Sequence, residues 1–185
     1  MRIITGSAKG TKLKTPQGFN TRPTADRVKE SLFNILGPQI KDAMVLDLFA
    51  GTGNLGLEAL SRGARHAVFV DHDSASVGIV KENAVRTKLT EKTEVYRNDV
   101  LKILLRFKHE KRFFDIVFCD PPYNQGWVQQ VLAFFDAHSL LNPCGLLIFE
   151  HSRHDMLPSD LKALQVDRVE FYGETVLSFV TIRIG

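Results

Sequence analysis

Apolar residues along this chain follow two alternating patterns, and the alternation predicts the fold. Short apolar runs predict strands at 44–48, 66–70, 114–119 and 145–150, and a further strand is predicted at 93–97. Apolar residues spaced three or four apart predict helices at 54–62 and 127–135. Two more helices are predicted, one capped by Ser74 and one that begins at Asn98-Asp99. Repeated strand–helix units imply a doubly wound α/β fold, with a mostly parallel sheet covered on both faces.

The two ends of the chain depart from this pattern. Residues 1–20 are predicted to form short strands and turns, the small β-hairpin of a basic N-terminal arm over residues 1–23. A helix follows from Thr24 and ends at Gly37-Pro38. At the other end, two strands at 165–172 and 175–184 are separated by only two residues, which predicts an antiparallel hairpin. Residues 24–185 are therefore expected to form one domain.

Composition narrows the class of protein. The chain has 185 residues, of which 44% are hydrophobic and 24% charged, as in ordinary globular domains. No apolar run reaches the roughly 18 residues of a membrane span, and the first residues have no signal-peptide core, so we expect a cytoplasmic protein. Cys119 and Cys144 are expected to be free thiols.

Positive charge gathers at the start of the chain. Residues 1–29 contain seven basic side chains and one acid, a net +6, whereas the whole chain has a net charge of +3. The basic residues are Arg2, Lys9, Lys12, Lys14, Arg22, Arg27 and Lys29. Such a segment suits a polyanionic partner, since lysine and arginine displace counterions from phosphates. A solvated hairpin with surplus lysines is the alternative.

The segment Gly51–Gly56 reads GTGNLG and matches the dinucleotide fingerprint G-x-G-x-x-G, with Asp71 twenty residues after Gly51. A nicotinamide-dependent oxidoreductase is one hypothesis. Asp47 argues against it, because a carboxylate at the tip of the first strand would face the pyrophosphate at a cost on the order of several kcal/mol. The same carboxylate favours a ligand that carries an ammonium group.

S-Adenosylmethionine fits these positions better than a dinucleotide does. Its ammonium group would face Asp47, and Gly51 and Gly53 would let the backbone approach its methionyl part closely. Asp71 has two acceptor oxygens for the ribose hydroxyls. Asp99 is expected near the adenine amino group and His72 beside the ribose or the adenine. For any one of these acids, the alternative is that it caps a helix and binds no ligand.

Asp120-Pro121-Pro122-Tyr123 is the most informative tetrapeptide of the chain. The prolines have no N–H and fix φ, so the neighbouring carbonyls and the Asp120 carboxylate are free to accept hydrogen bonds. Such acceptors suit a planar NH₂ group whose nitrogen then attacks a methyl group, and Tyr123 can stack on the ring. A simple Pro-Pro turn would require neither the acid nor the aromatic residue.

Other segments suggest less chemistry. His151 and His154 are predicted in a loop after a strand, where a solvated loop is favoured over a metal site, and no metal is expected. Residues 107–112 are predicted as a charged loop, and Trp127 as part of the apolar stripe of a helix.

Taken together, these motifs resemble a known family. The segments MRIITGSAKGTKLKTP, NTRPTADRVKESLFNIL, DLFAGTGNLGLEALSRGA and DPPY are similar to those of the bacterial 16S rRNA guanine-N2 methyltransferases that act on the small subunit. These are class I S-adenosylmethionine-dependent enzymes with a Rossmann-like fold. The resemblance implies a cofactor pocket and a guanine site at the positions described above. It also implies that Arg22, Thr24 and Arg27 lie near the active-site mouth and contact the cofactor carboxylate or the RNA backbone; a structural pairing of Arg22 or Arg27 with an acid is the alternative. From their charge, Lys9 and Lys12 of the basic arm are expected to contact RNA.

The resemblance leaves several alternatives open. D-P-P-Y is shared with adenine-N6 methyltransferases acting on DNA or RNA, which are the nearest rival. A non-catalytic RNA-binding module is a third hypothesis beside the oxidoreductase. Free 16S rRNA and the assembled small ribosomal subunit are both open as the form of the substrate.

Overall fold

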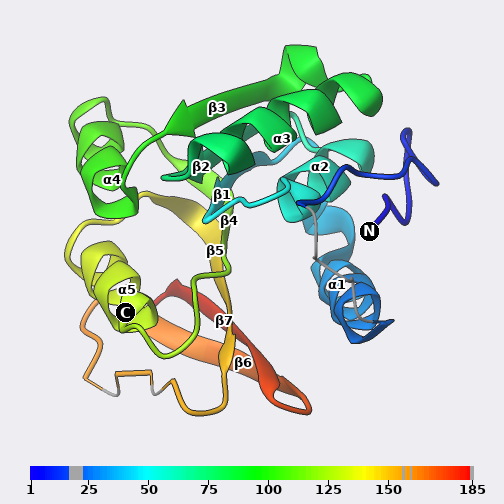
Figure 1. The fold of residues 1–185 in the computed structure, drawn as a ribbon. Helices are drawn as coiled ribbons and strands as arrows, with labels where there is room; N and C mark the ends of the chain where they lie inside the picture. Colours follow the sequence, from blue (N-terminus) through cyan, green and yellow to red (C-terminus); the bar gives the residue numbers. More distant parts are fainter. Residues whose placement is uncertain (17–22, 156, 159, 184–185) are drawn as a thin grey trace.

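The structure is a computed structural model that describes residues 1–16, 23–155, 157–158 and 160–183, with the backbone alone at 23–25 (Figure 1). It contains seven strands: β1 Met44–Leu48, β2 His66–Asp71, β3 Thr93–Arg97, β4 Phe114–Cys119, β5 Leu141–Ser152, β6 Leu164–Tyr172 and β7 Thr175–Ile182. The helices are α1 Pro23–Leu36, α2 Asn54–Ser61, α3 Ser74–Arg86, α4 Val100–His109 and α5 Trp127–Ala137, with 3₁₀ turns η1 Gly37–Ile40 and η2 Thr90–Lys92.

The strands form one sheet in the order β3-β2-β1-β4-β5-β7-β6. Pairing is parallel from β3 to β5, and β7 runs antiparallel to both β5 and β6. This is the predicted mostly parallel sheet with its C-terminal hairpin. The strand order reverses between β1 and β4, and ligands of such sheets bind beyond the carboxyl ends of the strands at this point.

Helices cover both faces of the sheet (Figure 1). Alternate strand residues point to opposite faces, so Val45 of β1 packs with α1, α2 and α3, whereas Leu46 and Leu48 pack with α4 and α5. Each face has its own buried apolar cluster, and full burial of one such side chain contributes about 1.5–3 kcal/mol. These two cores hold the strand ends in place at the site.

The N-terminal arm folds back on itself as the predicted short hairpin, with backbone hydrogen bonds between residues 1–3 and 10–13, and it lies against the helices. Its described residues make one antiparallel bridge, between Arg2 and Lys12. Ile3, Ala8 and Leu13 are buried in the core that α1, α2 and α3 share. The arm is therefore packed onto the domain through apolar contacts, and whether it acts as a separate unit stays a prediction.

Three local expectations were wrong. The cap of α3 is Asp73, which accepts a hydrogen bond from the Ser76 N–H, and not Ser74. The segment expected as a charged loop begins inside α4, because Phe107 is fully buried on the apolar face of that helix. β5 starts at Leu141 and runs to Ser152, so His151 lies in a strand, paired with Val176 of β7.

In the part of the chain that the structure describes, every helix is too short or too polar to cross a membrane. Among the same residues, no group of three His, Cys, Asp or Glu side chains is arranged to hold a metal ion. Both ring nitrogens of His151 already have protein partners, the Ser152 carbonyl and the Ser178 hydroxyl, each at 2.8 Å.

Candidate active site

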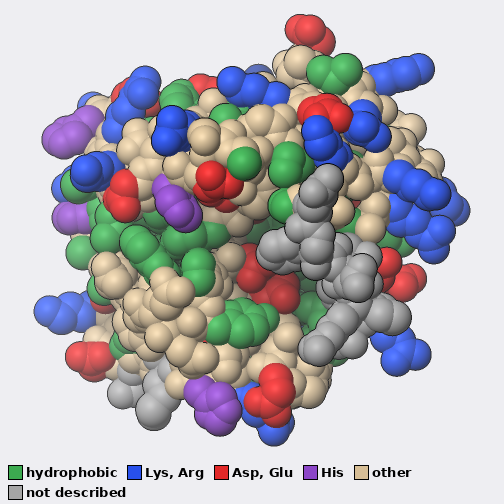
Figure 2. Space-filling model, in the orientation of Figure 1, with side chains coloured by type: hydrophobic (Ala, Val, Ile, Leu, Met, Phe, Trp, Pro, Cys, Tyr) green, Lys and Arg blue, Asp and Glu red, His purple; other side chains and the backbone are tan. Residues whose placement is uncertain are grey.

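The carboxyl ends of the parallel strands open into three neighbouring cavities. The central cavity has a volume of about 450 Å³. It is lined by Met1, Pro16, Lys29, Asp47, Phe49, Ala50, Gly51, Thr52, Asn54, Leu55, Asp73, Ser76, Asp120 and Glu150. Figure 2 shows this face hollowed near its middle, with acidic side chains in the hollow.

Two further cavities adjoin the central one through Phe49. The second cavity, about 470 Å³, is lined by Phe49, Asp71, His72, Asp73, Ser76 and the tetrapeptide from Asp120 to Tyr123. The third cavity, about 230 Å³, is lined by Phe49, His72, Asp99, Val100, Pro122, Gln125 and Trp127. The structure therefore brings the predicted strand-end acids and the D-P-P-Y segment to one edge of the sheet.

Asp47 lies at the floor of the central cavity and is only 2% exposed. Its carboxylate accepts a hydrogen bond of 2.9 Å from the N–H of Gly56, in the first turn of α2. Burial raises the pKa of Asp47 to about 7, with the Gly56 hydrogen bond opposing the rise and the nearby Asp71 charge adding to it. A buried carboxyl group in this state is stabilised in its charged form by a ligand cation.

The glycine loop, residues 51–53 before α2, has a left-handed backbone conformation at its two glycines. Gly51 has φ 54° and Gly53 has φ 76°, both in the left-handed region. A Cβ atom on Gly51 would have only the Phe49 carbonyl within 4 Å, so the loop is open on that side. The loop therefore leaves its backbone accessible from the central cavity.

Phe49 is a residue that the sequence motifs did not single out. It lines all three cavities and has φ 57°, a conformation that costs a non-glycine residue about 1–3 kcal/mol. Its ring meets that of Trp127 edge-on, with centroids 5.3 Å apart. Together with Asp99, which caps α4 through the Lys102 N–H, these rings form an apolar slot with a polar end. That chemistry suits a flat heterocycle such as adenine.

The D-P-P-Y segment leaves β4 directly. Asp120 opens to the central and second cavities, Pro121 is buried, and Tyr123 is 41% exposed. The Tyr123 hydroxyl lies 3.5 Å from that of Thr175 in β7. Below the segment, the buried carboxylate of Asp155 accepts hydrogen bonds from the N–H groups of Asn124 and Ser152. Asp155 thereby fastens the segment to the end of β5.

Glu150 lies level with Asp120 on the neighbouring strand. Cys119 of β4 pairs with Phe149 of β5, so the next residue of each strand, Asp120 and Glu150, reaches the same cavity. Asp120 is exposed to the cavity and Glu150 is half-buried. Desolvation raises the pKa of both carboxyl groups, and the charge of Glu150 raises the pKa of Asp120 further. Glu150 follows four apolar residues, as Asp47, Asp71 and Asp120 do, so the same sequence rule would have found it.

The basic residues of the first 29 positions divide into separate groups. Lys9, Lys12 and Arg27 are exposed, and Arg2, Lys9 and Arg27 line a shallow cavity of about 250 Å³. Figure 2 shows Lys and Arg side chains gathered over the N-terminal segment. Lys29 was counted with them, but it is 2% exposed and lines the central cavity. Arg22 and the Thr24 side chain lie outside the described residues.

Comparisons with known proteins identify the family of this chain. A family model described as Conserved hypothetical protein 95 matches residues 1–181. YlbH of Bacillus subtilis, described as a candidate rRNA methyltransferase, is 43% identical over 175 residues, which cover 95% of each chain. Ribosomal RNA small subunit methyltransferase D of Escherichia coli K12 is 36% identical over 162 residues, 86% of this chain and 78% of that protein.

A solved structure extends the likeness to three dimensions. The Escherichia coli protein YhhF, described as a candidate methyltransferase, superposes with a TM-score of 0.86 at 33% identity, covering 100% of this chain and 99% of that one. The family match and these identities show that the chain belongs to the Conserved hypothetical protein 95 family, the rRNA methyltransferase family that its motifs predicted.

Proposed function

We propose that this protein transfers a methyl group from S-adenosylmethionine to the exocyclic N2 amine of one guanine in 16S rRNA. The observation that carries the proposal is the shared cavity, where Asp47 and the glycine loop face the Asp120 carboxylate across the reversal of strand order. Membership of the rRNA methyltransferase family supports the coarser part of this proposal, methylation of rRNA.

The residues present fit the cofactor at each of its parts. Asp47 provides the buried negative charge that an ammonium group requires, and Gly51 leaves backbone open beside it. Asp71 keeps an acceptor site on each oxygen for the ribose hydroxyls, and the slot of Phe49 and Trp127 suits adenine. When bound, the cofactor supplies an electrophilic methyl group on a sulfonium.

The D-P-P-Y segment prepares the nucleophile. The Asp120 carboxylate and the carbonyls beside Pro121 and Pro122 can accept hydrogen bonds from both hydrogens of a planar amine. These hydrogen bonds orient the lone pair of the amine and shift electron density from the ring back to the nitrogen. Tyr123 is exposed enough to stack on the base. With the cofactor bound, the target amine would form the new N–C bond as the S–C bond breaks with its electrons left on sulfur, and the amine would give up one proton.

Glu150 supports Asp120 as the acceptor of that proton. A carboxylate whose pKa is raised is a stronger base, and the Asp120–Glu150 pair combines two such groups at the reaction site. A proton lost from the amine to Asp120 is stabilised by the neighbouring Glu150 charge. The chain therefore holds the amine and receives its proton with the same pair of side chains.

A labelled-methyl assay tests the substrate. The protein is supplied with methyl-labelled S-adenosylmethionine and, in parallel, free 16S rRNA, unmethylated small subunits and DNA, and the nucleic acid is then digested. Labelled N2-methylguanosine from 16S rRNA or subunits is the expected product. Labelled N6-methyladenosine would instead identify the adenine-N6 alternative, since the same acceptors suit any planar amine.

A thermal-shift experiment tests the cofactor separately. S-Adenosylhomocysteine should raise the melting temperature, because a ligand that binds only the native state stabilises it. NAD and NADP should not, since their pyrophosphate would meet the Asp47 charge. Stabilisation by a dinucleotide alone would contradict the proposal and favour the oxidoreductase hypothesis.

A further inference from the structure

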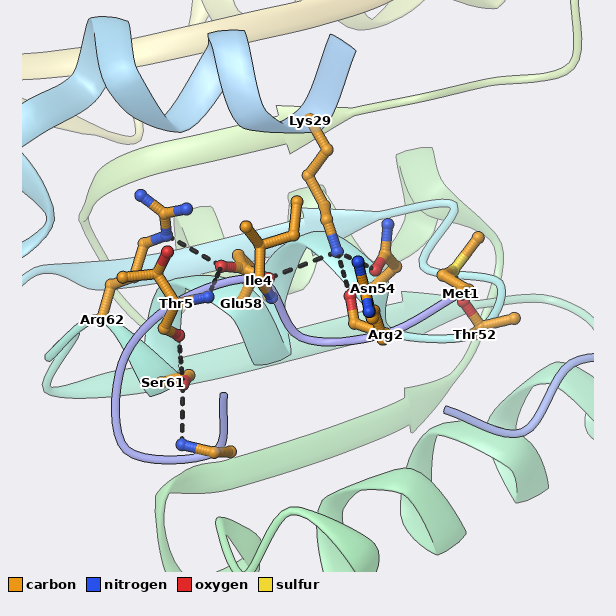
Figure 3. Close-up of polar contacts among 12 residues, drawn as sticks. Met1, Arg2, Ile4, Thr5, Lys29, Thr52, Asn54, Glu58, Ser61 and Arg62 are labelled. Atoms are coloured by element: carbon orange, nitrogen blue, oxygen red, sulfur yellow. Dashed lines mark hydrogen bonds and ion pairs between the residues drawn. The ribbon is translucent and has the colours of Figure 1, made fainter. Parts of the chain in front are cut away.

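Lys29 is a charged side chain that the proposed chemistry leaves unexplained. It projects from α1 toward the first turn of α2 (Figure 3) and is 2% exposed. Its ammonium nitrogen lies 2.7 Å from the Asn54 Oδ1 atom, 2.7 Å from the Arg2 carbonyl and 3.3 Å from the Glu58 carboxylate. An ammonium group has three hydrogens, so all of its donors have partners.

The contact with Asn54 fixes the orientation of the Asn54 amide. Lysine can only donate, so the amide atom that faces it must be the carbonyl oxygen. The NH₂ group of the amide is then turned away from Lys29, and among the described residues Oδ1 alone has a protein partner. Because Asn54 lines the central cavity, this NH₂ group is left to donate to a ligand.

Glu58 shows why Lys29 remains charged while buried. It is fully buried, and it accepts hydrogen bonds from the N–H groups of Ile4 and Thr5 and from the Arg62 guanidinium (Figure 3). Burial lowers the pKa of Lys29, and the Glu58 carboxylate opposes that change. One buried acid thus joins α1, α2 and the N-terminal arm around a single ammonium group.

Asn54 and Asp47 together match the two charges of an amino acid. Asp47 is acidic and suits an ammonium, whereas Asn54 offers a donor at the positive N-terminal end of α2, with the Lys29 charge behind it. A carboxylate is the group that such a donor binds best. The methionyl part of the cofactor carries both groups on one carbon.

We propose that the Asn54 amide binds the amino-acid carboxylate of S-adenosylmethionine, and that Lys29 is the positioning residue that turns the amide toward it. This inference rests on the proposed function for its ligand. It also gives the N-terminal arm a part in the cofactor site, because Lys29 holds the Arg2 carbonyl while Met1 and Pro16 line the same cavity.

Calorimetric titration with two ligands tests this inference without turnover. S-Adenosylhomocysteine carries the amino-acid group, and 5′-methylthioadenosine is the matching thioether nucleoside without it. Asn54→Ala should weaken binding of S-adenosylhomocysteine about tenfold and leave binding of methylthioadenosine within twofold of wild type. Asn54→Asp should weaken the first ligand further, since a carboxylate would face a carboxylate.

Lys29→Met should reproduce the Asn54→Ala pattern, and Lys14→Met is its matched control. Lys14 also joins the N-terminal arm to a helix, through Glu82 of α3 at 2.5 Å, but on the surface, and its loss should change neither affinity. If Lys29→Met does not fold, Asn54→Ala still decides the carboxylate contact.

Two results would overturn the inference: unchanged binding of S-adenosylhomocysteine by Asn54→Ala, or equal weakening of both ligands, which would indicate a purely structural role. Wild-type protein that binds neither ligand would instead mean that the proposed function itself has failed. The wild-type titrations therefore separate the two failures.

Discussion

The carboxylate of Asp71 accepts a hydrogen bond of 2.8 Å from the backbone N–H of Gly51, and its other oxygen accepts one from the N–H of Asp73. These contacts join the end of β2 to the glycine loop after β1. The twenty-residue spacing that resembles a dinucleotide fingerprint is therefore also a structural contact between adjacent strand ends. It holds the glycine loop in place whichever nucleoside the site binds.

Gly56 is predicted to serve packing rather than ligand binding. A Cβ atom at this position would lie 2.3 Å from the Phe69 ring and 3.1 Å from the Asp47 carboxylate. Phe69 is fully buried, so Gly56→Ala should lower the free energy of unfolding by about 1–3 kcal/mol in urea denaturation.

Gly78→Ala is the control for that substitution. Gly78 lies in α3, and a Cβ atom added there would meet no atom of another segment within 4 Å, so alanine should raise the free energy of unfolding by about 0.5–1 kcal/mol. Equal effects of the two substitutions would contradict the packing role of Gly56.

Asp120 is expected to act on turnover and hardly on cofactor affinity. Asp120→Asn keeps the size of the side chain and one acceptor oxygen but removes the charge that the amine hydrogens face. The turnover number should fall at least about 10²-fold, whereas the affinity for S-adenosylhomocysteine should stay within about threefold. Steady-state methylation and calorimetry measure the two quantities, and a variant that keeps wild-type turnover would remove Asp120 from the mechanism.

Affinity for S-adenosylhomocysteine should depend on pH through Asp47. Its pKa is raised to about 7, and the ligand ammonium favours the ionised form, so the affinity should rise as pH increases toward 7 and then level off. Below that value the affinity should fall by up to about tenfold per pH unit. Calorimetric titrations between pH 5.5 and 7.5 measure this pH dependence of the affinity. Asp47→Asn should remove the pH dependence. A pH dependence that survives the substitution would belong to another titratable group.

Asp47 should also make the unliganded protein less stable as pH rises. The native state keeps this proton up to about pH 7, whereas an unfolded chain releases it near 3.8. The native state therefore binds more protons between these values, and the contribution of Asp47 to the free energy of unfolding falls as pH rises through that window. Denaturation of the wild type and of Asp47→Asn across the window should differ by this slope, and parallel curves would contradict it.

Lys9 and Lys12 are predicted to contact the RNA backbone. Replacing both with alanine should weaken RNA binding for all sequences alike and reduce the slope of log affinity against log salt by about 0.7 per charge lost. Filter binding at several salt concentrations measures the slope. Lys108→Ala is the control, because Lys108 is exposed on α4, which covers the opposite face of the sheet; an equal loss there would mean that the effect is not specific to the N-terminal arm.

The sequence determined the parts of this protein that depend on neighbouring residues. Apolar runs located β1 and β4 at their observed bounds, and the acids that follow such runs came out at the same sheet edge. This works because parallel strands end on one side, so a local pattern fixes a position in space. The prolines of D-P-P-Y likewise restrict the backbone wherever they occur.

Only the tertiary structure decided the roles of side chains whose partners are remote in sequence. Lys29 looked like one more surface charge of a basic segment, yet Glu58, Asn54 and the Arg2 carbonyl enclose it, from 25 to 29 residues away. Glu150 gained its place beside Asp120 from the register of β4 with β5. The sequence gives the type and the spacing of the side chains. The burial of a side chain and its charged partners depend on which segments the fold packs together.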